Sequence, residues 1–378
     1  MNPVNGSVDL LQRFIQFPTV SSNPIIEFAS ELAERAEAIG GKVHRFETSS
    51  TKQNIVVQIG PSGADSIGLS GHMDVVPVEG QDWTMNPFEG IVDKDAVWGR
   101  GACDMKAFLA VTYNLLSDFP VQKMKRGITL IWTHDEEIGC VGASHLPKQC
   151  EHIEMPINIL IGEPTSQQIF HHHGGHCTLE LRVKGYPAHS SKPHLGISAT
   201  QWLFEAWTLV REWEQWLGRQ PSNITGAPPL VNVAQISAGS AINIIPEHGL
   251  IRLGLRPMPG HDHHHLIRRL QETLEPLQLE AANQGASITL DVIQAAAPLY
   301  TPLPTQLEQA IQQHCPDTPC LGAPFATDGG CLAEMNTKPL IWGPGSIDVA
   351  HQPNEYVKIK ELEEYQHSLE SILRTWCL

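Results

Sequence analysis

The chain has 378 residues, which is long for a single hydrophobic core and predicts two domains. Hydrophobic residues make up 41% and charged residues 17%, so the composition is typical of a folded globular protein and not of a disordered one. Acidic residues outnumber basic ones by 41 to 25, and the formal charge of -16, without a Lys/Arg stripe, argues against a nucleic-acid partner.

We expect a cytoplasmic protein without a membrane partner. No run of residues approaches the roughly 20 apolar positions that are needed to cross a bilayer. The first 14 residues lack the basic and apolar regions of a secretory signal. The eight cysteines include no CxxC pair, so we interpret them as reduced thiols.

The first half of the chain alternates helical segments with strand-like apolar runs. Residues 8–40 have helical periodicity and stop at Gly40-Gly41. Strands are then expected at 54–60, 66–76, 127–137 and 157–164. Because nearly continuous apolar strands suit a sheet that is covered on both faces, we predict an α/β fold with a central, mostly parallel sheet flanked by helices.

From about residue 176 the pattern changes to that of a small α+β domain. An alternating strand is followed by a Trp-rich helix, two more strands, a helix at about 262–280 and a last strand. The Trp-rich helix fits either the core of this domain or a partner interface. We therefore predict a catalytic domain in two parts, 1–175 and 295–378, with residues 176–294 inserted between them.

Acidic and histidine side chains gather where the apolar strands end. The residues at these positions are His72, Asp74, Glu136, Glu137 and Glu163. In open α/β sheets ligands bind in the crevice beyond the carboxyl ends of the strands. Three strands that deliver imidazole and carboxylate groups to one edge therefore predict a functional site there.

These residue types suit a metal site. His72 and Asp74 are one residue apart on a strand, so both side chains can point to the same side, and imidazole and carboxylate are zinc ligands. The adjacent acids Glu136 and Glu137 repel each other unless a cation lies between them. Asp104 has a simpler alternative as the N-cap of a helix. His351 lies far downstream in a Gly/Pro-rich segment.

Seven strings along the chain resemble the motifs of the M20 metallopeptidase family, in the family's order and spacing. They are SGHMDVVP, WGRGACDMKA, HDEEIG, IGEPTS, GYPAHSS, LRPMPG and GPGSIDVAHQPNEYV. Within that family the segments DWTMNPF and APFATDGG and the last of the seven strings are most similar to the acetylornithine deacetylase branch. The resemblance implies a zinc-hydrolase-type catalytic domain with a ferredoxin-like dimerisation and lid domain.

The resemblance also implies a role for each site residue. His72 and Glu163 would hold one Zn²⁺, Glu137 and His351 a second, and Asp104 would bridge the two ions. Co²⁺ is a possible substitute for zinc. Asp74 would sit behind His72 and set the tautomer of its ring.

The remaining roles belong to catalysis and to the substrate. Glu136, which is not a ligand, would be the general base, and His189 from the second subunit of a homodimer would stabilise the oxyanion. Arg256 would bind the substrate carboxylate, with a surface ion pair as the alternative. Asn243 and Gly345 would lie beside the substrate, or serve only as turn residues.

These expectations lead to one reaction and several rivals. The expected function is removal of the N-acetyl group from N2-acetyl-L-ornithine, with Asp328 as a hypothetical partner of the ornithine ammonium group. Succinyl-diaminopimelate desuccinylase, N-acetylcitrulline deacetylase, a dipeptidase or aminoacylase, and a noncatalytic metal-binding scaffold are the alternatives.

Four features have no assigned role. The clusters His171–His173 and His261–His265 are interpreted as solvated residues. The side chain of His134 either tunes the neighbouring acids or fills space, and Cys103 is interpreted as a buried inert thiol.

Overall fold

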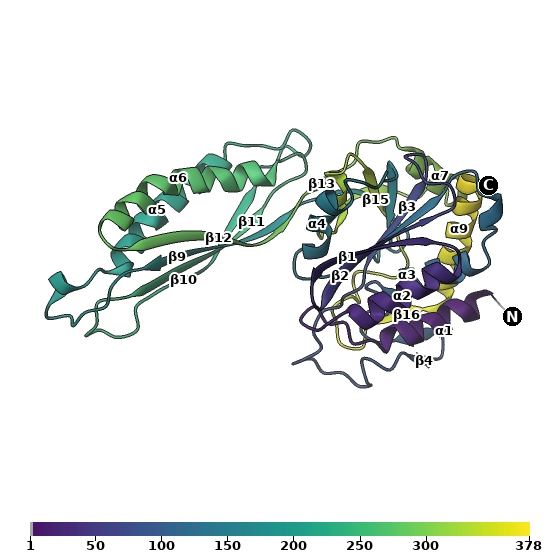
Figure 1. Cartoon of the computed structure of the whole chain (residues 1–378), viewed down its shortest axis with the longest axis horizontal. Coiled ribbons are helices and arrows are strands. Elements are labelled where there is room, and N and C mark those ends of the chain that lie inside the picture. Colours follow the sequence, from purple (N-terminus) through teal and green to yellow (C-terminus); the bar gives the residue numbers. More distant parts are fainter. Residues whose placement is uncertain (1–2) are drawn as a thin grey trace. The chain divides into compact units, whose positions relative to one another are not determined.

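The computed structural model describes residues 3–378, and this part of the chain forms two compact domains. The large domain runs to His172 and resumes at Tyr300, and the small domain comprises His173–Leu299. Each domain has its own cluster of buried hydrophobic residues. Figure 1 shows both domains, with the small one coloured teal and green. None of the described helices is long and apolar enough to cross a membrane.

The large domain is built on a mixed sheet of nine strands. Its order is β1 (Lys42–Ser49), β2 (Lys52–Ile59), β6 (Ile128–Thr133), β3 (Ile67–His72), β7 (Asn158–Ile161), β15 (Lys338–Ile341), β8 (Ile169–His173) and β13 (Leu299–Tyr300), with β14 (Cys320–Ala323) paired to β8. The central strands β6, β3, β7 and β15 are parallel, and β1, β2 and β8 pair antiparallel. Every residue of β3, β6 and β7 is buried, as a sheet covered on both faces requires. The predicted α/β fold class is confirmed.

Seven α-helices surround this sheet in the described part of the large domain. They are α1 (Pro3–Ile15), α2 (Ile26–Ala38), α3 (Lys106–Ser117), α4 (Val141–Gln149), α7 (Gln306–His314), α8 (Gly329–Ala333) and α9 (Ile359–Cys377). The single helical segment predicted at 8–40 is wrong, because it is divided into α1 and α2. Pro18 and Pro24 lie in the break, where proline cannot continue a helix.

A glycine brings α3 close to the sheet just before a site residue. A Cβ atom on Gly162 would lie 1.9 Å from the ring of Phe108, so a larger side chain would collide with α3. The next residue, Glu163, lies near Asp104, which comes just before the start of α3.

A separate three-stranded sheet joins two distant segments of the large domain. Its order is β16 (Tyr356–Lys358), β5 (Ala96–Trp98) and β4 (Ile91–Asp93). The pairing of β16 with β5 places the chain around Glu355 next to the chain around Arg100. Both flank the site described below.

The small domain is an antiparallel sheet with two helices on one face (Figure 1). The strand order is β10 (Leu230–Ala238), β11 (His248–Arg256), β9 (His176–Lys184) and β12 (Ser287–Ala296), and the helices are α5 (Ala199–Leu217) and α6 (His263–Asn283). Trp202 and Trp213 of α5 are buried in the core of this domain, whereas Phe204 on the same helix is 67% exposed. Two of the tryptophans therefore serve packing, and the helix keeps an exposed apolar side chain as well.

Candidate metal centre

The predicted ligands converge at one edge of the central sheet. His72 is the last residue of β3, Glu137 follows the end of β6, and Glu163 follows the end of β7. Because these three strands are parallel neighbours, their carboxyl ends meet at the same edge. Asp104 joins them from the turn that precedes α3, and His351 from the loop between β15 and β16.

Asp104 is shared by two groups of potential ligands. His72, Asp104 and Glu163 form one group, and Asp104, Glu137 and His351 form the other, with the ligand atoms of each group within 4.8 Å of one another. Oδ1 of Asp104 lies 3.0 Å from Nε2 of His72, and Oδ2 lies 3.2 Å from Nε2 of His351. Nε2 of His351 is also 3.0 Å from Oε2 of Glu137. One carboxylate therefore faces both groups, which is the arrangement that a pair of metal ions requires.

The buried carboxylates at this edge of the sheet favour the binding of cations. Burial raises the pKa of Glu137 to about 7 and raises that of Glu163 well above its usual range. Hydrogen bonds that the His351 ring donates to the carboxylates of Asp104 and Glu137 raise its pKa to about 11, although burial lowers it. Oε1 of Glu137 is buried without a hydrogen-bond partner among the described residues. Buried carboxylates with free oxygen atoms fit two divalent ions in place of the protons that they would otherwise retain.

Comparisons with known proteins agree with this geometry. The family model described as peptidase family M20/M25/M40 matches residues 68–375. The chain belongs to the M20 peptidase family. This metallohydrolase family includes dinuclear metal sites, as in the M20 peptidase of Bacillus subtilis, whose structure is described as a dinuclear metal-binding peptidase.

Curated relatives match this M20 protein over nearly its whole length. The acetylornithine deacetylase of Buchnera aphidicola (subsp. Acyrthosiphon pisum, strain Tuc7) is 26% identical over 390 residues, with 98% of both chains covered. That of Photorhabdus laumondii is 28% identical over 386 residues, with 98% of this chain and 97% of the relative covered.

Solved structures show the same fold at lower identity. The M20 metallo-carboxypeptidase Sso-CP2 of Sulfolobus solfataricus superposes with a TM-score of 0.75 at 18% identity, covering 98% of this chain and 99% of the other. The Bacillus subtilis peptidase has a TM-score of 0.63 at 14% identity, with 98% and 97% covered. At these identities the likeness establishes the fold of the M20 protein and not its substrate.

Asp74 contacts the site in a way that the sequence did not predict. The Nδ1 atom of His72 lies 2.9 Å from the backbone oxygen of Asp74, whereas the nearest carboxylate oxygen is 3.7 Å away. The Asp74 carboxylate instead accepts the backbone N–H groups of Glu136 at 3.0 Å and Glu137 at 3.3 Å, and the hydroxyl of Ser21 at 2.7 Å. Asp74 therefore holds the turn that carries the two acids.

The predicted base lies beside the ligands. Glu136 is half-buried, and burial raises its pKa well above the usual range, with the negative charges of Glu163 and Asp328 adding to the rise. The thiol of Cys140 is 3.6 Å from Oε1 of Glu136. A carboxyl group with a raised pKa next to a potential metal pair is suited to accept and return a proton.

Asp328 is buried behind this base. Only 2% of its surface is exposed, the hydroxyl of Thr133 donates to Oδ2 at 2.5 Å, and it forms a compact group with Glu136 and Cys140. Burial raises the pKa of Asp328 to about 6. Its contact with a substrate ammonium group stays a prediction.

The small domain carries three of the predicted substrate residues, at two different ends. His189 and Asn243 are exposed and adjacent, because the N–H of Ser190 donates to the backbone oxygen of Asn243 at 3.0 Å. Arg256 is the last residue of β11 and is exposed at the opposite end of the sheet. Eight steps along β11 separate its ends by roughly 27 Å.

Gly345 has a packing role in the structure. Its φ of +79° favours glycine, and a Cβ atom there would lie 2.5 Å from the Sγ atom of Cys103. Cys103 itself is buried, and burial raises the pKa of its thiol well above the usual range. These contacts explain Gly345 without a substrate, and its place beside the substrate stays a prediction.

His134 points away from the ligands. Nε2 lies 2.7 Å from the hydroxyl of Thr48, and Nδ1 lies 3.1 Å from the carboxylate of Asp135, which is paired with Lys52. The side chain is buried in this polar cluster behind the site.

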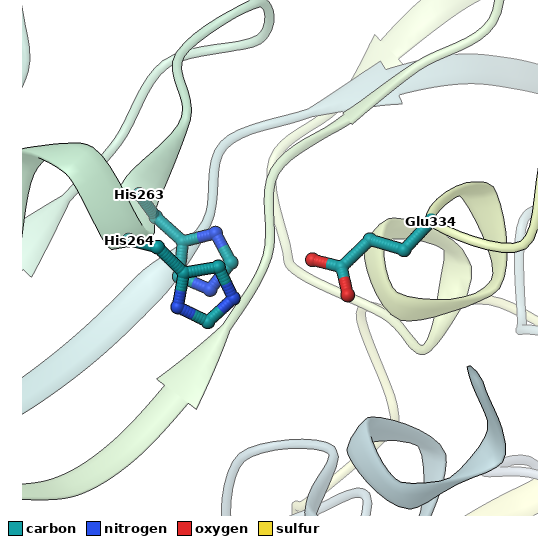
Figure 2. A group of neighbouring side chains, drawn as sticks. All are labelled: His263, His264 and Glu334. Carbon is teal, nitrogen blue, oxygen red and sulfur yellow. The ribbon is translucent and has the colours of Figure 1, made fainter. Parts of the chain in front are cut away.

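The histidine clusters belong to other parts of the chain. Their interpretation as solvated residues is wrong for His173 and His263, which are buried with 1% and 4% of their surface exposed. Figure 2 shows His263 and His264 at the start of α6 and Glu334 after α8. The two histidine rings lie 4.0 Å apart between centroids. Because the two histidines and Glu334 belong to different domains, we assign no metal site to them.

Three residues around the site were not singled out by the sequence analysis. They are Gln81, Arg100 and Glu355. Arg100 and Glu355 lie inside strings that carry the family resemblance, and each is a charged residue that the structure buries completely, with 0% and 1% of its surface exposed. Their contacts link segments about 250 residues apart, for which the sequence contains no local signal.

Proposed function

We propose that this M20 hydrolase is a dinuclear zinc deacetylase that converts N2-acetyl-L-ornithine and water to L-ornithine and acetate, a step of arginine biosynthesis. The observation that carries the proposal is the shared carboxylate of Asp104, which lies between two ligand groups next to the non-ligand acid Glu136. The choice of substrate rests on the relatives named acetylornithine deacetylase, which match along nearly the full chain.

His72, Asp104 and Glu163 would hold one ion, and Asp104, Glu137 and His351 the other. Bound zinc, or cobalt in its place, supplies Lewis acidity that polarises the amide carbonyl and makes a water molecule more acidic. The donor set of imidazole and carboxylate groups suits either metal.

Glu136 would carry the proton through the reaction. It accepts a proton from the attacking water while the water oxygen bonds to the acetyl carbon, and it then donates this proton to the amine nitrogen as the C–N bond breaks. The backbone N–H of Glu136 donates a hydrogen bond to the Asp74 carboxylate, and this bond would keep the Glu136 carboxyl group at the site during both transfers.

The substrate would be held by two copies of the chain. Arg256 would pair its planar guanidinium group with the substrate carboxylate, and His189 would donate a hydrogen bond to the oxyanion. Because roughly 27 Å separates the ends of β11, His189 and Arg256 of one small domain cannot contact the same small substrate. This distance supports a homodimer in which His189 and Asn243 come from the second copy.

Steady-state hydrolysis by the zinc-loaded protein tests the proposal. We expect the highest kcat/KM with N2-acetyl-L-ornithine, compared with N-acetylcitrulline, N-succinyl-diaminopimelate and a dipeptide. Glu136→Gln should lower kcat by about 10² to 10⁴-fold while two zinc ions stay bound.

A higher kcat/KM for another of these substrates would agree with the proposed mechanism but show that N2-acetyl-L-ornithine is not the preferred substrate. Full activity of Glu136→Gln would remove Glu136 as the base. Two bound metal ions without hydrolysis of any substrate would favour the noncatalytic scaffold.

A further inference from the structure

His351 is held differently from the other proposed ligands. Its side chain is 48% exposed, whereas those of His72, Asp104, Glu137 and Glu163 are 1% to 7% exposed. It lies on a loop instead of a strand end, with a φ of +63°, a region that residues other than glycine occupy only where their surroundings hold them. The place of the His351 ring therefore depends on what fixes this loop.

Gln81 fixes the backbone of His351 directly. Its Nε2 atom donates to the backbone oxygen of His351 at 2.9 Å. Its Oε1 atom accepts from Nη2 of Arg100 at 2.5 Å and from Nε1 of Trp83 at 3.1 Å. Two N–H donors at Oε1 set the orientation of the amide, so its NH₂ group has to face His351.

Arg100 connects Gln81 to the rest of the loop. Its guanidinium group is fully buried, donates from Nη1 to Oε2 of Glu355 at 2.6 Å, and lies 5.1 Å from the centroid of the Trp83 ring. Nη1 also donates to the backbone oxygen of Gln352 at 3.4 Å. A planar group with several N–H donors can satisfy these acceptors together, which lysine cannot.

Glu355 extends the network to the shared ligand. Its Oε1 atom accepts the backbone N–H groups of Cys103 at 2.8 Å and Asp104 at 3.0 Å. Two further hydrogen bonds join the segment that carries Gln81 to the 351–355 loop, because Oδ1 of Asn354 accepts both the N–H and the hydroxyl of Thr84 at 2.9 Å. Gln81 thus acts on His351 alone, whereas Arg100 acts on His351 and on Asp104 through Glu355.

We propose that Gln81 and Arg100 are positioning residues of the metal centre, which hold the 351–355 loop so that His351 meets Glu137 and Asp104. Neither residue contacts the proposed ligand atoms. The inference rests on the metal assignment of the proposed function. It adds that Gln81 and Arg100 set the metal affinity of the site that contains His351.

Cobalt titration of the metal-free protein, followed by visible absorption and by competition with a chelator, tests this inference. Gln81→Glu keeps the acceptor for Arg100 and removes the donor to His351. We expect it to lower the affinity of one of the two sites by about 10- to 100-fold and to leave the other unchanged. The Tm of metal-free Gln81→Glu should stay within about 2 °C of the wild type, because Gln81 is only half-buried and the acceptor for Arg100 is kept.

Gln12→Glu is the matched control. Gln12 also donates from Nε2 to a backbone oxygen, that of Gly90 at 2.7 Å, but away from the ligands. This variant should bind both ions as the wild type does. Arg100→Lys should weaken both sites, since it loosens Glu355 and Gln81 together; if it does not fold, Gln81→Glu decides alone.

A double-mutant cycle with His351→Ala shows whether Gln81 acts through this histidine. In the His351→Ala background, Gln81→Glu should cause no further loss of cobalt affinity. Wild-type affinity of Gln81→Glu at both sites, equal loss at both sites, or the same loss without His351 would overturn the positioning role. A wild-type protein that binds fewer than two ions would instead overturn the metal assignment, and with it this inference.

Discussion

The carboxylate of Asp74 accepts the backbone N–H of Glu136 at 3.0 Å, so a residue of the His72 motif holds the proposed base in place. The second oxygen of the same carboxylate accepts from Glu137 and from Ser21. Glu355 performs the corresponding task on the other side of the site, where it accepts the N–H groups of Cys103 and Asp104. Two buried carboxylates that are not proposed as ligands therefore fix the two turns that carry the acids.

Asp74→Asn should lower kcat more than it raises KM. The asparagine oxygen can accept only one of the two N–H groups of Glu136 and Glu137, and the NH₂ group would face the other donor, so the turn that carries both acids loses part of its support. We expect kcat to fall by about 10- to 100-fold at saturating zinc, and the affinity for zinc to fall as well. Steady-state kinetics with metal content measured in parallel checks this. Asp82→Asn, an exposed position, should match the wild type, and unchanged kcat in Asp74→Asn would rule out the positioning role.

Mixed dimers should reveal whether His189 serves a second copy. His189→Ala and Glu136→Gln should each be nearly inactive as pure preparations. When the two are unfolded, mixed and refolded, half of the dimers pair different copies, and each mixed dimer has one site with both residues intact. Activity should therefore return to about a quarter of the wild type. No recovery, with mixed dimers demonstrated by tagged copies, would show that His189 does not act across subunits.

Asp328→Asn should change the choice between ornithine and citrulline substrates. If the carboxylate meets the ornithine ammonium group, its loss should lower kcat/KM for N2-acetyl-L-ornithine by about 10-fold or more relative to N-acetylcitrulline, because a buried charge pair is lost. An equal reduction for both substrates would instead place Asp328 behind Glu136 as a structural group, in keeping with its bond from Thr133.

The Glu31 cluster on α2 should contribute acid-sensitive stability. Hydrogen bonds from Arg13 at 2.7 Å, with the help of Arg35, lower the pKa of Glu31 from its usual 4.5 to about 2. A lowered pKa in the folded state stabilises the protein above pH 4.5, and this contribution is lost as the pH falls from 4.5 toward 2. Because Arg13 is half-exposed, we expect no more than about 1 kcal/mol.

Urea unfolding of metal-free Glu31→Gln measures this contribution. The variant should be less stable than the wild type at pH 7, and the difference should shrink below pH 4.5 and vanish near pH 2. Glu34→Gln, an exposed position on the same helix, is the control and should show no difference at either pH. A deficit of Glu31→Gln that is independent of pH would show that the charge of Glu31 is not responsible.

The amino-acid sequence by itself determined the central sheet and the edge at which the site lies. The runs that become β3, β6 and β7 are mostly apolar. His72 ends the first of them, and Glu137 and Glu163 follow the other two within a few residues. These signals are local. A strand that is buried on both faces is apolar in its own sequence, so it can be recognised without knowing which strands pair with it. The strings shared with the M20 family then assigned a role to each residue.

The tertiary structure alone decided what holds these residues. Asp74 accepts N–H groups that lie 62 and 63 residues away in the chain, and Gln81 donates to a backbone oxygen 270 residues away. Arg100 and Glu355 are buried as a pair, although charged residues are usually exposed. Hydrogen bonds between a side chain and a distant backbone group produce no periodicity and no fixed spacing, so only the folded chain shows which turns of the site they hold.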